Sequence, residues 1–130
     1  MNIYNNTGLG TTIWSPLAAG LLTGKYNQGT PPESRMALQG FDWLANKQLS
    51  EARLAITCQL THLAAELGVP LARVAIAWTI KNPHVTTAIL GATRPEQLLQ
   101  NLGSLDVVTL LTTEVMERIE GILQNKPVQQ

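Results

Sequence analysis

The chain is poor in charged residues, and this shortage removes two kinds of binding partner. Charged side chains make up 14% of the 130 residues, whereas about 25% is usual for soluble domains. Positive and negative charges balance to a formal net charge of zero, and Lys and Arg form no run. Binding to nucleic acid or to an anionic membrane surface therefore has no electrostatic support.

Cysteine and long hydrophobic runs are scarce as well. The single cysteine, Cys58, excludes an internal disulfide and fits a reducing compartment. No stretch approaches the about 18 consecutive apolar residues of a membrane span, and Met1–Asn6 lacks the regions of a signal peptide. We therefore expect a cytoplasmic protein. With 45% hydrophobic residues in the length of one domain, it has much surface to bury.

Two short apolar segments are typical of β-strands. Thr12–Trp14 follows the polar, glycine-containing segment Asn5–Gly10, which we expect to be a loop. Val85–Leu90 is β-branched and lies between Pro83 and Gly91, which is the profile of a buried strand.

Two longer helices are predicted between these strands. Ser50 caps the first, which runs to Leu67 and stops at Gly68. Pro70 begins the second, which ends at Asn82. Apolar residues lie on and beside the main stripe of the second helix, so we expect it to be buried on more than one side. The stripe is Leu71, Val74, Ala75 and Trp78, with Ile76 and Ile80 beside it.

Two further helices are predicted in the last third of the chain. Thr93–Glu96 matches a capping box at the start of a short helix. A last helix begins near Thr112, where Leu111 and Met116 have the spacing of a hydrophobic staple. The tail, residues 126–130, is expected to be loose. The short helix is expected to turn three leucines inward, namely Leu98, Leu99 and Leu102.

The order of these elements indicates parallel βα units. Strands alternate with helices along the chain, and a long loop, Asn27–Gln39, follows the first strand. Two strands cannot make a stable parallel sheet alone, because such sheets need several strands covered on both faces. We therefore expect an α/β architecture that is incomplete on its own.

Both predicted strands lead into turns that suit an anionic ligand. After the second strand, Gly91 lets the backbone approach a ligand, Thr93 caps the next helix, and Arg94 adds a positive charge. After the first strand, Ser15 offers a hydroxyl and Lys25 a point charge. The alternative is an ordinary strand-to-helix turn with a solvated polar face. Amides that can contact a heterocycle follow one turn later, at Gln97, Gln100 and Asn101.

Other chemical patterns are weak. Gly20–Tyr26 is no P-loop, because three rather than four residues separate its glycines and Tyr26 stands where Ser or Thr must bind magnesium. Cys58 and His62 lie four residues apart, but without further ligands a structural role is favoured and we expect no metal site. We predict no catalytic residue.

Several spaced motifs occur in order along nearly the whole chain. They are Trp14-Ser15-Pro16-Leu17-Ala18, Gly20, Thr23-Gly24-Lys25-Tyr26, Pro31-Pro32, Ser34-Arg35, Ala75-Ile76-Ala77-Trp78, Leu90-Gly91-Ala92-Thr93, Glu96-Gln97-Leu98, Asn101 and Asn125-Lys126-Pro127. Together they resemble the carboxyl-terminal part of the aldo-keto reductases. The most similar branch contains the potassium-channel β subunits with their bacterial and plant relatives.

This resemblance implies a fold, a cofactor and a reaction. The family is a (β/α)8 TIM barrel that binds NADPH at the carboxyl ends of its strands and reduces small aldehydes and ketones. Residues 1–130 would form a partial domain, with Thr11–Trp14 as the seventh strand and Val85–Leu90 as the eighth. The family's catalytic Asp, Tyr, Lys and His belong to its amino-terminal half, and nothing in this chain matches them.

The resemblance also implies a set of cofactor-binding residues. Lys25 and Arg35 would hold the pyrophosphate and the 2′-phosphate, although Glu33 between them could repel phosphate. Gln100 stands where relatives often have Glu, and Thr93 where they often have Ser. The nicotinamide side would be lined by Trp14, Ser15, Pro16, Leu17 and Ala18, and the 2′-phosphate and adenine would contact Gly91, Thr93, Gln97, Gln100 and Asn101.

Three functional hypotheses follow. In the first, the chain is the NADPH-binding segment of a reductase and is inactive alone, with the remainder of the barrel, or other copies of itself, as partner. In the second, it belongs to a non-catalytic regulatory module whose partner is a channel-like membrane protein. In the third, it is a small helical packing domain that binds no cofactor.

Overall fold

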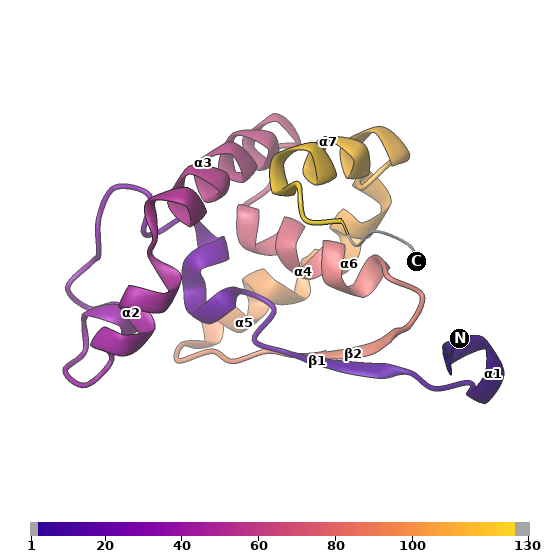
Figure 1. Ribbon diagram of the computed structural model, residues 1–130, viewed down its shortest axis with the longest axis horizontal. Helices are drawn as coiled ribbons and strands as arrows, with labels where there is room; N and C mark the ends of the chain where they lie inside the picture. The colour runs from indigo at the N-terminus through magenta and orange to yellow at the C-terminus, as the bar shows by residue number, and fades with distance from the viewer. Residues whose placement is uncertain (1–2, 127–130) are drawn as a thin grey trace.

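The computed structural model describes residues 3–126, and its α/β architecture combines two strands with several helices (Figure 1). The predicted tail lies mostly in 127–130, outside the described residues. The elements in chain order are α1 (Ile3–Thr7), β1 (Thr11–Trp14), η1 (Ala18–Thr23), η2 (Arg35–Ala37), α2 (Asp42–Gln48), α3 (Glu51–Glu66), α4 (Leu71–Lys81), β2 (Val85–Ile89), α5 (Pro95–Leu102), α6 (Ser104–Val107), η3 (Val108–Leu110) and α7 (Thr113–Leu123), where η denotes a 3₁₀ helix.

The two strands pair in parallel, as their order with the helices predicts. Trp14 of β1 lies opposite Ile89 of β2, so both strands end at the same edge of the sheet. The register shifts between Thr11 and Thr12. Just before β1 the Thr86 side chain lies against Gly10, where an added Cβ would lie 1.7 Å from Thr86 Oγ1. Only glycine fits there without a shift of its neighbour.

Helices cover one face of this sheet. Figure 1 shows α4 and α5 on one side of the strands and no described element on the other. Trp14 is consequently 81% exposed and Ile89 56% exposed. The prediction that Val85–Leu90 is a buried strand is therefore wrong for this structure: its apolar residues are present, but a parallel strand is fully buried only when layers cover both faces.

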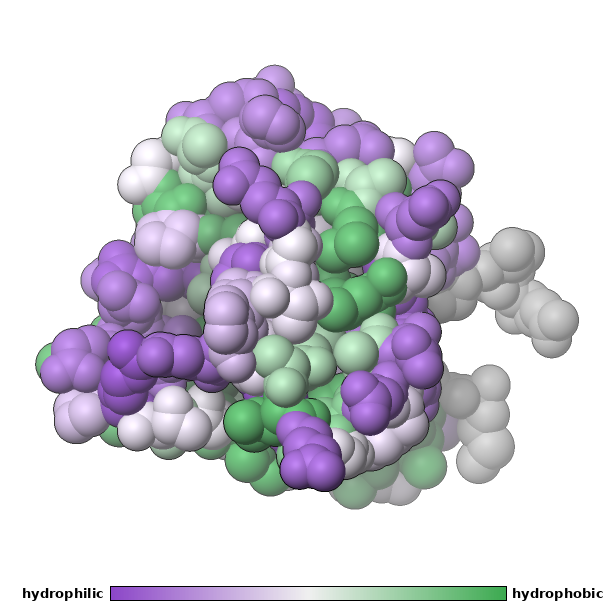
Figure 2. Space-filling model, turned by 90° about the vertical axis from the view of Figure 1, so that its left-hand side faces the viewer, coloured by the Kyte–Doolittle hydropathy of each residue, from purple (hydrophilic) through white to green (hydrophobic). Residues whose placement is uncertain are grey.

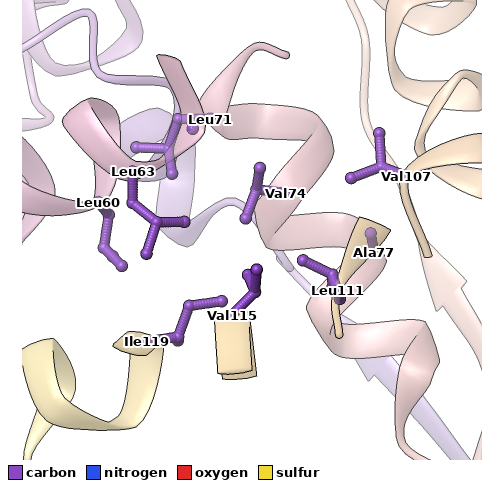
Figure 3. Packing of buried hydrophobic residues seen from close by; sticks show 10 residues of the cluster. Leu60, Leu63, Leu71, Val74, Ala77, Val107, Leu111, Val115 and Ile119 are labelled. Carbon is purple, nitrogen blue, oxygen red and sulfur yellow. The ribbon is translucent and has the colours of Figure 1, made fainter. Parts of the chain in front are cut away.

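The hydrophobic core lies between α3, α4, α6 and α7. Figure 3 shows Leu63 of α3, Val74 of α4 and Ile119 of α7 directed toward a common centre. Burial of α4 on more than one side is confirmed, because both Val74 and Ile76 are buried. Trp78 was expected in the same stripe but is 38% exposed. Ala77 is the last residue of α4 in the core cluster, and Trp78 is not packed inside that cluster.

Two predicted helix starts are confirmed by their caps. Ser50 lies one residue before α3, and its hydroxyl accepts a hydrogen bond from the backbone N–H of Arg53 at 3.4 Å. The Thr112 hydroxyl accepts one from the N–H of Val115 at 3.3 Å, before α7. Leu111, preceding that cap, is completely buried.

Three local predictions are wrong. The segment expected as a loop, Asn5–Gly10, overlaps helix α1. The Tyr4 ring of this helix stacks on the His84 ring, with 4.2 Å between the ring centroids. The N-cap of α5 is Arg94 rather than Thr93. The three leucines expected to face inward on α5 are exposed by 45%, 69% and 52%, because no described element packs against that side; they are Leu98, Leu99 and Leu102.

In the described part of the chain, no single helix is long and apolar enough to cross a membrane. Within these residues, only α3 and α4 taken together, at an angle of 92° to each other, reach the length and apolar composition of a span. Both helices contribute buried residues to the core.

Candidate functional site

The carboxyl edge of the sheet carries both candidate loops. Because β1 and β2 are parallel and in register at Trp14 and Ile89, the segment after β1 and the segment after β2 leave the sheet on the same side. Figure 2 is the view onto this side, and it shows hydrophobic side chains next to hydrophilic ones. In sheets of this kind the carboxyl edge is where ligands bind.

The turn after β1 holds several residues in the left-handed region. The φ angles are +52° at Ser15, +48° at Ala18, +57° at Ala19 and +95° at Gly20. The Ser15 hydroxyl accepts a weak hydrogen bond from the N–H of Ala19 at 3.4 Å. A left-handed conformation costs about 1–2 kcal/mol for a residue with a Cβ. Strain of this kind gathers at ligand sites, and it marks this turn as a candidate site.

Lys25 follows that turn and is exposed. Its Nζ lies 5.2 Å from the centroid of the Tyr26 ring. Gly20 makes room for the side chain, since an added Cβ there would lie 3.0 Å from Lys25 Cε. Gly24, with φ of +80°, sets the direction in which the chain reaches Lys25. A shallow hollow beside this lysine is lined by Lys25, Gln28, Gly29, Thr30 and Pro31.

Arg35 is a second exposed cation that lies near an aromatic ring. Its guanidinium carbon lies 5.5 Å from the centroid of the Phe41 ring. The neighbours Ser34 and Met36 are buried, so they anchor the short helix η2 that carries the arginine. The rings of Tyr26 and Phe41 were not among the predicted site residues. Tyr26 is adjacent to Lys25 in the sequence, whereas nothing in the sequence indicates that Phe41 contacts Arg35.

The loop after β2 is organised by the amide of Gln97. Its Oε1 accepts hydrogen bonds from Thr93 N at 3.0 Å, Thr93 Oγ1 at 3.2 Å and Arg94 N at 3.3 Å. Gln97 is the third residue of α5, and its side chain accepts from the N–H of the N-cap residue Arg94, as in a capping box. The Nε2 of Gln97 keeps its donors, and Gly91 faces open space, because an added Cβ there would meet nothing within 4 Å.

The two residues at the end of α5 have different surroundings. The carbonyl oxygen of Gln100 accepts a hydrogen bond from Arg73 Nε at 2.7 Å, which ties α5 to α4. Asn101 is 7% exposed and lines a groove between α4, β2 and α6 rather than the outer surface of the loop. Arg73 was not predicted to matter here; its guanidinium occupies the space that a Cβ at Gly103 would need.

The structure leaves the predicted residues on separate segments: residues 14–25 lead out of β1, Arg35 lies on η2, and residues 91–101 follow β2. Across residues 3–126, no hydrogen bond or ion pair joins the loop after β1 to the loop after β2. Of the predicted nicotinamide side, Trp14 and Ser15 are exposed, and Pro16, Leu17 and Ala18 are half-buried.

The donors at this edge have the chemistry of a phosphate site. Among residues 3–126 the ion pair joins Arg118 to Glu66. Within these residues, Lys25, Arg35 and Arg94 therefore form no ion pair with a carboxylate. Guanidinium and ammonium groups are the usual ligands of phosphates. A nucleotide cofactor with several phosphates fits this donor set.

The edge carries no cluster of metal ligands. Cys58 on α3 is half-buried and His62 is exposed, and no group of three His, Cys, Asp or Glu side chains gathers anywhere in residues 3–126. The chemistry that the arrangement supports is ligand binding and orientation.

Fold and edge together define an α/β protein that presents cations at the carboxyl ends of parallel strands. Residues 1–124 match the model of the Aldo/keto reductase family. The chain belongs to this family, as its motifs predict, and members of the family generally use NADP(H).

Two plant proteins are similar over nearly the whole chain. Both are described as a probable voltage-gated potassium channel subunit beta, one from Oryza sativa subsp. japonica and one from Arabidopsis thaliana. Each is 48% identical over 126 residues, which is 96% of this chain. The chain spans 38% of the length of these curated relatives.

Proposed function

We propose that this chain is the NADPH-binding, carboxyl-terminal segment of a (β/α)8 aldo-keto reductase barrel whose complete form reduces small aldehydes and ketones. The observation that carries the proposal is the exposed cation Lys25, which follows the strained turn at the carboxyl end of β1, with a second exposed cation, Arg35, on η2; neither has an ion-pair partner among residues 3–126. The family match and the NADP(H) use of the family support it.

Each part of the edge would have its own task. Lys25 and Arg35 would hold the pyrophosphate and the 2′-phosphate by charge-assisted hydrogen bonds. The turn from Trp14 to Ala18 would lie along the nicotinamide. Gly91 and the Nε2 of Gln97 would face the 2′-phosphate and adenine, together with Thr93, Gln100 and Asn101. When bound, NADPH supplies the hydride; this chain's residues bind and orient it.

The partner in this proposal is the remainder of the barrel. Each strand has an unpaired edge in the described structure, and one face of the sheet is uncovered. Strands from the remainder would pair with those edges and cover that face. Without them, self-association of the chain would bury the same surfaces. We place the assembled protein in the cytoplasm.

A second function is favoured by the relatives. Both similar plant proteins are described as channel β subunits at 48% identity. In this alternative the bound NADPH acts as a sensor within a regulatory module that associates with a channel-like membrane protein. The nucleotide site is common to both proposals.

The test is a calorimetric titration of the chain with NADPH, beside a size-exclusion run on the same sample. The signal can also be quenching of Trp14, Trp43 and Trp78, since two of these rings are more than half exposed. Saturable binding supports the proposed site. A chain that elutes as a defined species and takes up no NADPH would contradict it.

A further inference from the structure

The loop that presents Lys25 is fastened to helix α3 by one side-chain hydrogen bond. Asn27 Nδ2 donates to Thr61 Oγ1 at 3.0 Å. The Thr61 hydroxyl in turn donates to the carbonyl oxygen of Thr57 at 2.8 Å. Because its proton is committed to the helix backbone, Thr61 Oγ1 offers a lone pair to Asn27.

The backbone around Lys25 is shaped to meet this threonine. Gly24 is left-handed, with φ of +80°, and an added Cβ would lie 3.1 Å from Thr61 Oγ1. The N–H of Asn27 donates to the carbonyl oxygen of Gly24 at 3.1 Å, which closes a turn around Lys25 and Tyr26. Thr61 therefore bonds to one end of this turn and lies close beside Gly24 at the other.

Within the turn, the two central side chains point in different directions. Tyr26 is 1% exposed and packs into the protein, whereas Lys25 is exposed with its ammonium near the Tyr26 ring. Movement of the turn away from α3 would therefore move the ring and the lysine together.

We propose that Thr61 is a positioning residue that fixes the Lys25 ammonium through Asn27. The proposal rests on the function proposed above, in which Lys25 binds a phosphate of NADPH. Thr61 is half-buried and would not touch the ligand itself. Its effect on the ligand passes through the hydrogen bond to Asn27 and the contact with Gly24.

A matched control lies on the neighbouring helix. Thr79 of α4 donates to the carbonyl oxygen of Ala75 at 3.0 Å, the same hydrogen bond to the preceding turn that Thr61 makes in α3. Thr79 is also half-buried, and no loop side chain bonds to it among residues 3–126. Thr79→Val therefore removes the helix bond without the loop bond.

The experiment compares Thr61→Val, Thr61→Ser and Thr79→Val in the 130-residue chain. We expect Thr61→Val to raise the Kd for NADPH by about three- to tenfold, the value of one lost hydrogen bond. Thr61→Ser retains the hydroxyl and should restore wild-type affinity. Thr79→Val should leave affinity unchanged and lower the melting temperature by less than Thr61→Val does, since it loses one hydrogen bond rather than two. Equal losses of affinity in the two valine variants, or no restoration by serine, would overturn the proposal.

Hydrogen exchange separates this inference from the proposed function. The backbone amides of Gly24 and Asn27 should exchange several times faster in Thr61→Val, and at wild-type rates in Thr61→Ser and Thr79→Val. If the wild-type chain does not bind NADPH, the proposed function fails, and exchange alone decides whether Thr61 holds this turn. Unchanged exchange in Thr61→Val would overturn the inference whatever NADPH does.

Discussion

Lys25 and Arg35 share an arrangement in which an aromatic ring supports an exposed cation. The rings are those of Tyr26 and Phe41, at 5.2 Å and 5.5 Å from the cationic atoms. A ring at this distance attracts the cation and limits its freedom, so less conformational entropy remains to be lost when a ligand binds. At the residue scale, the candidate site is a pair of pre-oriented charges.

Removing either charge should weaken NADPH more than NADH, because only NADPH carries the 2′-phosphate. We expect Lys25→Ala or Arg35→Ala to raise the Kd for NADPH about tenfold or more, the value of a lost hydrogen bond between charged groups. Parallel calorimetric titrations with both nucleotides measure this difference. The control is Lys47→Ala, an exposed lysine on α2. Equal losses for NADPH and NADH would remove the 2′-phosphate assignment.

Glu33 lies between Lys25 and Arg35 in the sequence, and its negative charge should weaken phosphate binding. It is exposed and carries no ion pair among residues 3–126, so its carboxylate repels an approaching phosphate. Glu33→Gln should lower the Kd for NADPH by about two- to fivefold at low salt, and less at high salt because screening weakens the repulsion. Titrations at two ionic strengths check this. Glu117→Gln, on the exposed side of α7, should change nothing; an equal gain there would point to net charge alone.

At the scale of elements, the edge depends on the close approach of the two strands. An added Cβ at Gly10 would lie 1.7 Å from Thr86 Oγ1 and 3.1 Å from Thr86 Cβ. A residue with a Cβ at this position would therefore force the Thr86 side chain or the strand to shift. The position of the Lys25 turn, in contrast, depends on α3 through Thr61.

Gly10→Ala should destabilise the chain by about 1–3 kcal/mol, as overpacking at a tight site does. Urea or thermal unfolding measures the loss. Adding Thr86→Ala removes the clashing hydroxyl and should recover part of the stability. Gly121→Ala in α7 is the contrasting variant: its Cβ would meet nothing within 4 Å, and alanine favours the helix. A Gly10→Ala chain as stable as wild type would contradict the strand pairing at this point.

At the scale of the whole molecule, large hydrophobic residues remain exposed where the described structure has no covering layer. They include Trp14 and Ile89 on the open face of the sheet, and Leu98, Leu99, Leu102 and Leu105 on α5 and α6. A groove beside these leucines runs along β2. Surfaces of this kind favour association.

The 130-residue chain alone should therefore self-associate. Leu105 is 66% exposed, and Leu105→Glu should reduce the associated fraction seen by size exclusion with light scattering. Leu38→Glu changes a leucine that is 51% exposed next to η2, away from the groove, and should have little effect. A monodisperse wild-type monomer that melts cooperatively would contradict this prediction.

Local patterns predicted much of this fold because they depend on near neighbours. Ser50 and Thr112 cap helices with their own hydroxyls, so the starts of α3 and α7 could be read from the chain. The short helix α1 was missed, because five residues show no period and its Tyr4 is placed by a distant partner, His84. Long-range contacts of this sort have no local signature.

The candidate site also has features that the local sequence predicts and features that depend on long-range contacts. Sequence alone determined the family, through motifs in a fixed order, and the strand–turn units that carry Lys25 and Gly91, because those depend on residue types a few positions apart. The tertiary structure was needed to see that Thr61 holds the Lys25 turn and that the leucines of α5 face outward. These depend on which surfaces meet, and a side chain is buried only where another element covers it.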